Sequence, residues 1–165
     1  MDAKIDCSFR AGDRWFRLRA CGIVLNRGKV LMVRNMRDPY YYSLGGGVLH
    51  GEQIEKAVIR EVLEETGCAL EIDRLAFIHE NFFIGDETEP LKGLICHELA
   101  FYFLMKWNPN FQINSAGKTF DGLNEELVWL EIEKLSKQEV PVYPEFFGTE
   151  LVNLTDIPKH IITTD

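Results

Sequence analysis

The chain has 165 residues, of which 46% are hydrophobic, and a formal net charge of −8. This predicts one packed domain over residues 1–165, and the negative charge without a basic run excludes general nucleic-acid binding. The longest apolar stretch, 99–105, is far shorter than the roughly 20 residues of a membrane span, and neither a signal peptide nor a disulfide spacing is visible. We therefore expect a cytoplasmic protein without membrane contact.

Aliphatic and aromatic runs predict strands, and runs of helix formers predict helices. Strands at 15–26 and 29–35 flank an Asn-Arg-Gly-Lys turn and predict a hairpin. A helix is expected over residues 53–66, because Gly67 suits the left-handed position beyond a helix end. Two long strands, a short strand and two helices, the last opened by Pro144, follow at 69–84, 94–107, 127–130, 131–138 and 143–152. The sum is an α+β fold with a mixed sheet flanked by helices.

Three glutamates share one face of the predicted helix, since spacings of three and four residues bring side chains together. Glu61, Glu64 and Glu65 repel one another there and face the negative end of the helix dipole. A solvated acidic face is the simpler interpretation of such a cluster. The glycines at 45–47 favour a metal site instead, because bare backbone lets a carbonyl or a phosphate approach. Carboxylates suit Mg²⁺, which also binds substrate phosphates.

The glycines and the acidic helix together form one motif with a fixed spacing of residues, which a random sequence would rarely contain. The motif resembles the signature of the Nudix hydrolases (MutT-like), and its matching positions are Gly46, Glu52, Arg60, Glu61, Val62, Glu64, Glu65 and Gly67. The resemblance implies an α/β/α sandwich around the mixed sheet. It also implies hydrolysis of a pyrophosphate bond in a nucleoside diphosphate linked to another group, as in a nucleotide sugar, a dinucleotide or a nucleoside triphosphate. Segments 81–83, 97–103 and 143–145 resemble a bacterial Nudix subgroup of unassigned substrate.

The resemblance also implies roles for individual residues. The implied ligands of Mg²⁺, or of Mn²⁺, are Glu61, Glu64, Glu65 and the carbonyl of Gly45. The implied catalytic group is Glu61, Arg60 and Glu52. Within it, Arg60 and Glu52 pair and hold the loop against the helix. The general base stays open, because a later loop can supply it in place of Glu61; the other candidates are Glu98, Glu125, Glu126 and Glu145.

Candidate substrate-binding residues lie outside the motif. Arg34 and Arg37 follow a strand and precede the glycines, where a guanidinium can meet a phosphate. Phe83 ends a strand and can stack on a base, although most aromatic residues are expected in the core. Strand alternation puts either His97 or Glu98 inside the sheet, and Glu98 resembles an extra glutamate that some family members place near the metal.

Two positions depart from the common form of the motif, since Leu44 replaces a proline and Leu49 a glutamate. We therefore expect differences in the loop rather than in the helix. Two functional hypotheses remain. The first is a metal-dependent pyrophosphohydrolase that acts on a small phosphorylated, nucleotide-containing substrate, and the second is a Nudix-fold sensor that binds nucleotides without turnover. The complete set of glutamates favours the enzyme, and the sequence leaves open whether the protein forms a homodimer.

Overall fold

The computed structural model describes residues 4–36, 38–86, 90–112 and 125–164. Its strands, in chain order, are β1 (Ser8–Ala11), β2 (Arg14–Ile23), β3 (Leu25–Asn26), β4 (Lys29–Asn35), β5 (Tyr41–Gly47), β6 (Ile72–Ile84), β7 (Ile95–Met105), β8 (Glu125–Glu131), β9 (Val142–Tyr143) and β10 (Lys159–Thr164). Its helical segments are α1 (Ile54–Thr66), α2 (Ile132–Ser136), α3 (Phe147–Glu150) and the 3-10 turn η1 (Leu151–Asn153).

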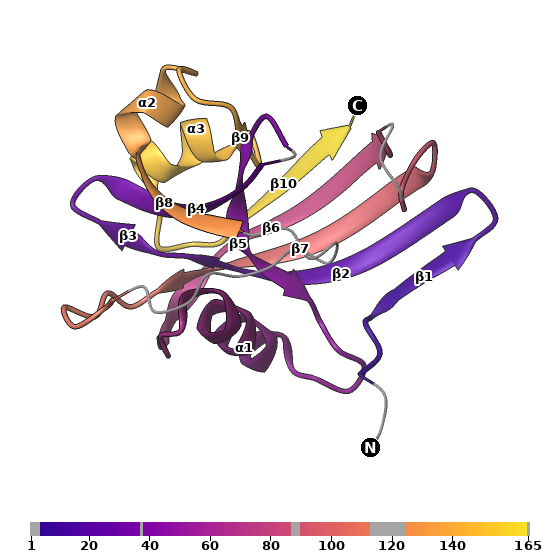
Figure 1. Cartoon of the computed structure of the whole chain (residues 1–165), viewed down its shortest axis with the longest axis horizontal. Coiled ribbons are helices and arrows are strands. Elements are labelled where there is room, and N and C mark those ends of the chain that lie inside the picture. The colour runs from indigo at the N-terminus through magenta and orange to yellow at the C-terminus, as the bar shows by residue number, and fades with distance from the viewer. Residues whose placement is uncertain (1–3, 37, 87–89, 113–124, 165) are drawn as a thin grey trace.

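The strands of the described residues join in one mixed sheet, with the central order β10-β6-β7-β2-β5-β4-β3 (Figure 1). The remaining strands β1, β8 and β9 pair with β2, β4 and β5. Strand β2 is parallel to β7, with Arg19 opposite Ala100, and antiparallel to β5, with Cys21 opposite Gly45. It therefore joins the two halves of the sheet and runs directly beside the glycines.

Helices cover both faces of the sheet, with α1 below it and α2 and α3 above it in Figure 1. Alternate residues of β2 and β4 serve two separate cores, as the period of two in a strand requires. The core on the α1 side contains Ala20, Val24, Leu31, Val33, Leu44, Val58 and Val62. The core on the other side contains Cys21, Ile23, Val30, Met32, Leu135, Phe147 and Leu151. This arrangement confirms the predicted sandwich and the α+β class.

Several predicted elements agree with the structure. The helix at 53–66 is α1, the long strands at 69–84 and 94–107 are the antiparallel pair β6 and β7, and the short strand at 127–130 is β8. The hairpin prediction was only partly right. The strand expected at 15–26 breaks at Val24, and only β3 pairs with β4 across the turn. Strand β2 pairs with β5 and β7 instead, because its apolar residues are shared between the two cores.

Two regions required larger corrections. The glycines at 45–47, expected in a loop, belong to strand β5. The last two helices are shorter than predicted, and the one expected at 143–152 does not begin at Pro144, because Tyr143 pairs with Tyr42 of β5 and the helix starts at Phe147. Strands β1, β9 and β10 had not been predicted. They are short and lie at sheet edges or in short local pairings, where hydrophobic alternation is weak.

Candidate active site

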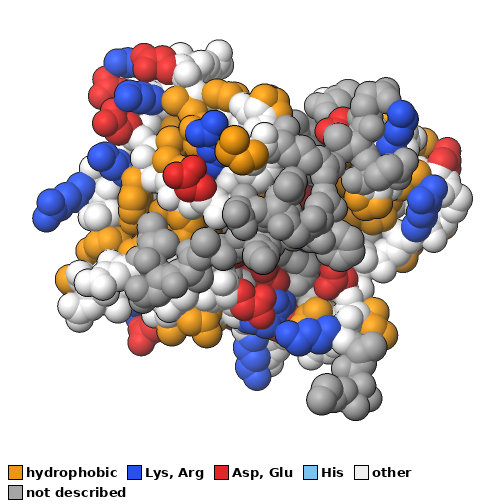
Figure 2. Space-filling view, viewed as in Figure 1, with side chains coloured by type: hydrophobic (Ala, Val, Ile, Leu, Met, Phe, Trp, Pro, Cys, Tyr) orange, Lys and Arg blue, Asp and Glu red, His pale blue; other side chains and the backbone are white. Residues whose placement is uncertain are grey.

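Helix α1 presents an apolar face to the sheet and ends in a glycine cap. It begins after Gln53 and stops at Gly67, whose φ of 72° is left-handed and whose N–H donates to the carbonyl of Leu63. The buried residues of the helix are Ala57, Val58, Val62 and Thr66. Packing of this face turns Glu61 and Glu65 toward β5, while Glu64 stays exposed. On the face shown in Figure 2, acidic and basic side chains lie side by side at the lower edge, where Figure 1 places α1.

Two glycines of β5 meet two of the helix carboxylates. The N–H of Gly45 donates to Oε2 of Glu65 at 2.9 Å. A Cβ on Gly46 would lie 2.4 Å from Oε2 of Glu61, so only glycine leaves room for this carboxylate. Gly45 has a φ of 130°, and a Cβ there would lie 2.4 Å from the carbonyl oxygen of Ala20. The glycines therefore permit the close approach of β5 to both α1 and β2.

Arg60 connects the start of α1 to its carboxylates. Its Nε and Nη2 donate to the two carboxylate oxygens of Glu52, each at 2.8 Å, so the predicted pair is present as a bidentate fork. Nη2 also donates to the carbonyl of Gly47 at 3.1 Å, and Nη1 donates to Glu61 at 2.5 Å. Glu52 accepts a further bond from the N–H of Leu49, and the bonds from Arg60 lower its pKa. This network holds the segment after β5 against the helix.

Burial shifts the pKa values of two carboxylates of α1. Burial raises the pKa of Glu61, although the hydrogen bond from Arg60 opposes this. Burial likewise raises the pKa of Glu65 well above its usual value, the bond from Gly45 opposes it, and the charges of Glu61 and Glu125 raise it further. Both shifts come mainly from burial, with repulsion between the carboxylates as a smaller cause, and a cation placed between these side chains would favour their charged forms.

The donors present fit a hard divalent cation. Among the described residues, no three His, Cys, Asp or Glu side chains converge into a ready-made metal cage. Mg²⁺ does not need one, because it binds through one or two carboxylates and completes its shell with water and substrate phosphates. The carboxylate oxygens beside the glycines belong to Glu61 and Glu65, and the exposed Glu64 lies one turn from Glu61. The carbonyl of Gly45 accepts a hydrogen bond from Arg19 and keeps a second lone pair for an ion. These residues would hold the ion.

The structure separates the other candidates for the general base. Glu125, at the start of β8, accepts a hydrogen bond from the hydroxyl of Tyr42 at 3.2 Å, and burial raises its pKa. Its charge also raises the pKa of Glu65, though less than burial does. Glu126 and Glu145 are exposed. Glu125 is thus brought to the acidic helix by strand pairing.

Arg19 was missed in the sequence. Its side chain is only 12% exposed, its Nη2 donates to the carbonyl of Gly45 at 3.1 Å, and its Nη1 lies 3.6 Å from Oε1 of Glu98. Glu98 is buried and the neighbouring His97 is 41% exposed, so Glu98 is the inward member of the alternating pair. A charged residue within the apolar run Leu-Arg-Ala-Cys of β2 was the signal that could have identified Arg19.

The predicted substrate-binding residues are not gathered at one point. Arg34 is exposed on β4, with its guanidinium 5.7 Å from the centre of the Tyr41 ring. Tyr41 lies six residues along β5 from Gly47, which is opposite Arg19 in the pairing of β2 with β5. At 3.3 Å per residue, the distance from Tyr41 to Gly47 is roughly 20 Å. Arg37 lies outside the described residues.

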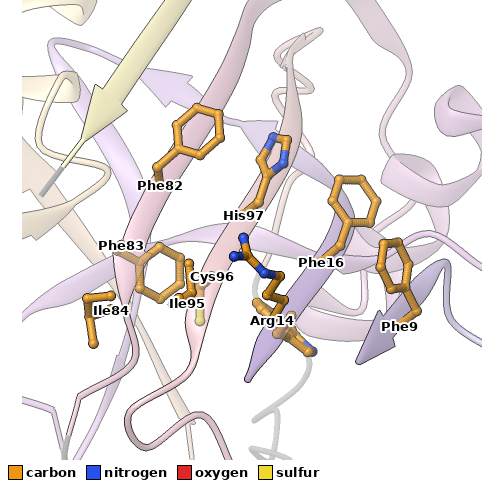
Figure 3. Close-up of a pocket in the computed structure, with 10 residues that line it drawn as sticks. Phe9, Arg14, Phe16, Phe82, Phe83, Ile84, Ile95, Cys96 and His97 are labelled. Atoms are coloured by element: carbon orange, nitrogen blue, oxygen red, sulfur yellow. The ribbon is translucent and has the colours of Figure 1, made fainter. Parts of the chain in front are cut away.

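Phe83 belongs to a separate aromatic region at the ends of β2, β6 and β7. It lines a pocket of about 400 Å³ with Phe82, His97 and Phe16 (Figure 3). The His97 ring stacks on Phe82 at 4.3 Å between centroids and meets Phe16 edge-on at 5.3 Å. This pocket includes none of the α1 glutamates, so it and the acidic cluster are distinct features.

Comparison with known proteins agrees with this geometry. The family model described as NUDIX domain matches residues 15–147. The chain therefore belongs to the Nudix family, the class of pyrophosphohydrolases whose motif the glycines and glutamates resemble. A curated relative, an ADP-ribose pyrophosphatase from Methanocaldococcus jannaschii, is 32% identical over 63 residues, a match that covers 36% of this chain and 37% of that protein. The chain thus spans little more than a third of that relative's length.

Solved structures share the fold at low sequence identity. A MutT protein from Bacillus halodurans superposes with a TM-score of 0.64 at 18% identity, covering 90% of each chain. A MutT protein from Methanosarcina mazei Go1 gives 0.58 at 19% identity, covering 81% of this chain and 90% of its own. An ADP-ribose pyrophosphatase from Streptococcus suis gives 0.54 at 16% identity, covering 89% and 98%. These likenesses concern the sandwich fold.

Membrane association through a helix finds no support in the part of the chain that the structure describes. None of its helices is both long enough and apolar enough to cross a bilayer.

Proposed function

We propose that this protein is a metal-dependent pyrophosphohydrolase that cleaves a pyrophosphate bond in a nucleoside diphosphate linked to another group. The observation that carries the proposal is the approach of Glu61 and Glu65 to the bare backbone of Gly45 and Gly46. Membership in the Nudix family supports the reaction class, and the names of its ADP-ribose pyrophosphatase relatives support a small nucleotide-derived substrate.

The proposed metal ligands are Glu61, Glu64, Glu65 and the carbonyl of Gly45, and the proposed ion is Mg²⁺, with Mn²⁺ as an alternative. Bound there, the ion would neutralise phosphate charge and lower the pKa of an attacking water. Glu65 is already oriented by the N–H of Gly45. Arg60 and Glu52 are proposed to keep the glycine strand and the helix in register, through the fork and the bond to Gly47.

Two carboxylates are proposed as alternatives for the base that takes the proton of the water. Glu61 lies against Gly46 but is held by Arg60. The charge of Glu125 raises the pKa of Glu65, and Tyr42 donates to Glu125. Replacing each by glutamine separates them, because loss of the base removes the acidic limb of the pH profile of kcat. Loss of a ligand instead raises the Mg²⁺ concentration that activity requires.

For the part of the substrate beyond the pyrophosphate, we propose Arg34 with Tyr41. Their distance from the glycines is compatible with the length of a nucleotide, and the Arg34 guanidinium is exposed. Phe83 is proposed as an alternative stacking surface, because its pocket is aromatic.

The proposal is tested by incubating the protein with Mg²⁺ and a panel of nucleotide sugars, dinucleotides and nucleoside triphosphates, and measuring release of phosphate or nucleoside monophosphate. We expect turnover of at least one member, and its loss in EDTA. If no member of the panel is turned over while a nucleotide still raises the melting temperature, the enzyme hypothesis is wrong and the nucleotide-sensor hypothesis is supported.

A further inference from the structure

Polar side chains cross three neighbouring strands on the sheet face opposite α1. Arg17 of β2 is paired with Glu98 of β7, and Glu98 with Asn81 of β6. Arg19 lies two residues further along β2, on the same face. Glu98 and Asn81 are buried and Arg17 is half-buried. A charged row of this kind within a sheet needs partners, because burying an unpaired charge is costly.

The hydrogen-bonding capacity of this row is not filled. The buried Nε of Arg19 finds no acceptor among the residues that the structure describes. Oε1 of Glu98, whose side chain is 7% exposed, also forms no hydrogen bond within them, and its 3.6 Å approach to Arg19 is a charge contact only. Buried polar groups are nearly always paired, so the Nε of Arg19 can still take an acceptor and Oε1 of Glu98 a donor, from water or from a ligand.

The charges in the row favour an anion. Two guanidiniums, Arg17 and Arg19, share one buried carboxylate, Glu98. Burial lowers the pKa of Arg17, and repulsion from Arg19 lowers it further, which shows that the two cations act on each other. Asp6 attracts Arg17 but is exposed, where solvent screens its charge. Asn81 donates to the hydroxyl of Tyr143.

Gly45 joins this row to the acidic helix. Its N–H donates to Glu65 and its carbonyl accepts from Arg19, so one residue of backbone separates the carboxylate from the guanidinium. A diphosphate has two charged groups a single bridging oxygen apart. With a divalent cation held by the carboxylates, one phosphate would lie on their side and the other against the guanidinium.

We propose that Arg19, with Arg17 beside it, binds an oxyanion of the substrate's diphosphate on the side of Gly45 away from α1. The inference rests on the proposed function, and it adds a second anchoring point that the motif does not contain. In it, Glu98 is a positioning residue that holds Arg19 in place through its charge. The unfilled Nε of Arg19 becomes a donor to the phosphate, and its planar fork suits that geometry.

The test measures binding of methylenediphosphonate, a diphosphate that cannot be hydrolysed at its bridge, by calorimetry with Mg²⁺ and again in EDTA. The variants are Arg19→Lys, which keeps the charge and loses the fork, and the double variant Arg19→Gln with Glu98→Gln, which removes both buried charges. Arg74→Gln is the matched control. Arg74 is also an arginine in a strand, and its buried Nε has no hydrogen-bond partner among the described residues, but its other nitrogens donate to Asp73 and to the carbonyl of Thr155. Circular dichroism checks the fold of each.

We expect Arg19→Lys and the double variant to weaken binding by about tenfold or more, the loss of one charge-assisted hydrogen bond, and Arg74→Gln to leave it unchanged. Without the diphosphonate, the affinity for Mg²⁺ should not fall in either variant. Arg19→Lys keeps the positive charge near the metal site, and the double variant removes that charge, which would repel Mg²⁺. A folded variant with wild-type affinity overturns the inference and leaves Arg19 and Glu98 as a structural ion pair. Failure of the wild type to bind the probe in both conditions also overturns it.

The wild-type protein supplies a measurement that does not depend on the folding of variants. The Nε–H resonance of Arg19 should shift when the diphosphonate saturates the protein, and an unchanged resonance contradicts the inference. The substrate panel remains separate. Turnover of a substrate together with an unchanged Arg19 resonance would support the hydrolase and contradict binding of the diphosphate by Arg19. Binding that depends on Arg19, without turnover of any substrate, would support the anion site and contradict the hydrolase.

Discussion

The two faces of the sheet carry opposite charges where they meet at Gly45. On the α1 face, Glu61 and Glu65 crowd against the glycines, while on the other face Arg17 and Arg19 outnumber Glu98. The carboxylates become neighbours through the period of a helix, and the arginines meet their carboxylate only through strand pairing. One side suits a cation and the other an anion, so the charges of a metal-bound diphosphate match this junction.

The largest effect is expected from the residue that joins the two faces. Gly45→Ala adds a Cβ 2.4 Å from the carbonyl oxygen of Ala20 at a φ of 130°. Strain and overpacking together should lower the free energy of unfolding by about 3–5 kcal/mol. Gly12→Ala is the control, because Gly12 also has a positive φ but a Cβ there meets nothing within 4 Å. Urea denaturation compares them, and equal losses would show that backbone strain alone matters.

The acidic face is tested by Glu65→Gln. Loss of this carboxylate should reduce kcat/KM by about 100-fold or more at moderate Mg²⁺. The melting temperature of the metal-free protein should not fall, because burial disfavours the charge of Glu65, whose pKa is raised. Glu55→Gln, an exposed glutamate in the first turn of α1, serves as the control and should behave as the wild type. Full activity of Glu65→Gln at saturating Mg²⁺ would exclude the ligand role.

A smaller effect with a defined pH dependence is expected for Glu52→Gln. Arg60 lowers the pKa of Glu52, so this carboxylate stabilises the fold above its unfolded pKa of about 4.5 and loses that contribution as pH falls through the lower folded value. The variant should therefore be about 1.5 kcal/mol less stable near neutral pH. The difference should shrink in acid. Denaturation curves at both pH values measure it.

The control for this prediction is Glu133→Gln, whose pair with Lys137 is fully exposed at 2.6 Å. Solvent screens that pair, so its replacement should change stability little at either pH. A difference for Glu52→Gln that is independent of pH would assign the effect to the lost hydrogen bond with Leu49 rather than to the charge of Glu52.

The smallest effect concerns Arg34, which lies on the arginine-bearing face but far from Gly45. Arg34→Gln should raise KM for nucleotide-containing substrates by about threefold, the worth of an exposed cation–aromatic contact, with kcat unchanged. Binding of methylenediphosphonate should stay at the wild-type value. A weaker affinity of the Arg34→Gln variant for that probe would indicate that Arg34, and not Arg19, binds the diphosphate.

Much of the fold was predictable where local signals are strong. Helix α1 was placed within one residue, because helix formers and a capping glycine determine its ends locally. Strand β5 was expected as a loop, since three consecutive glycines have low strand propensity and only pairing with β2 holds them extended. At Leu49, which departs from the common motif, the backbone N–H donates to Glu52, a contact that does not depend on the side chain at this position.

By itself, the sequence determined a mixed sheet flanked by helices, the spaced motif and the clustering of Glu61, Glu64 and Glu65, because these follow from period, composition and spacing along the chain. The α/β/α sandwich was implied by the resemblance of the motif to the Nudix family. Only the tertiary structure decided that the buried Glu98 meets Arg19, that Tyr42 donates to Glu125, and that Arg19 reaches the carbonyl of Gly45. These contacts join residues more than 20 positions apart on different strands, and strand pairing depends on whole strands and not on any local pattern.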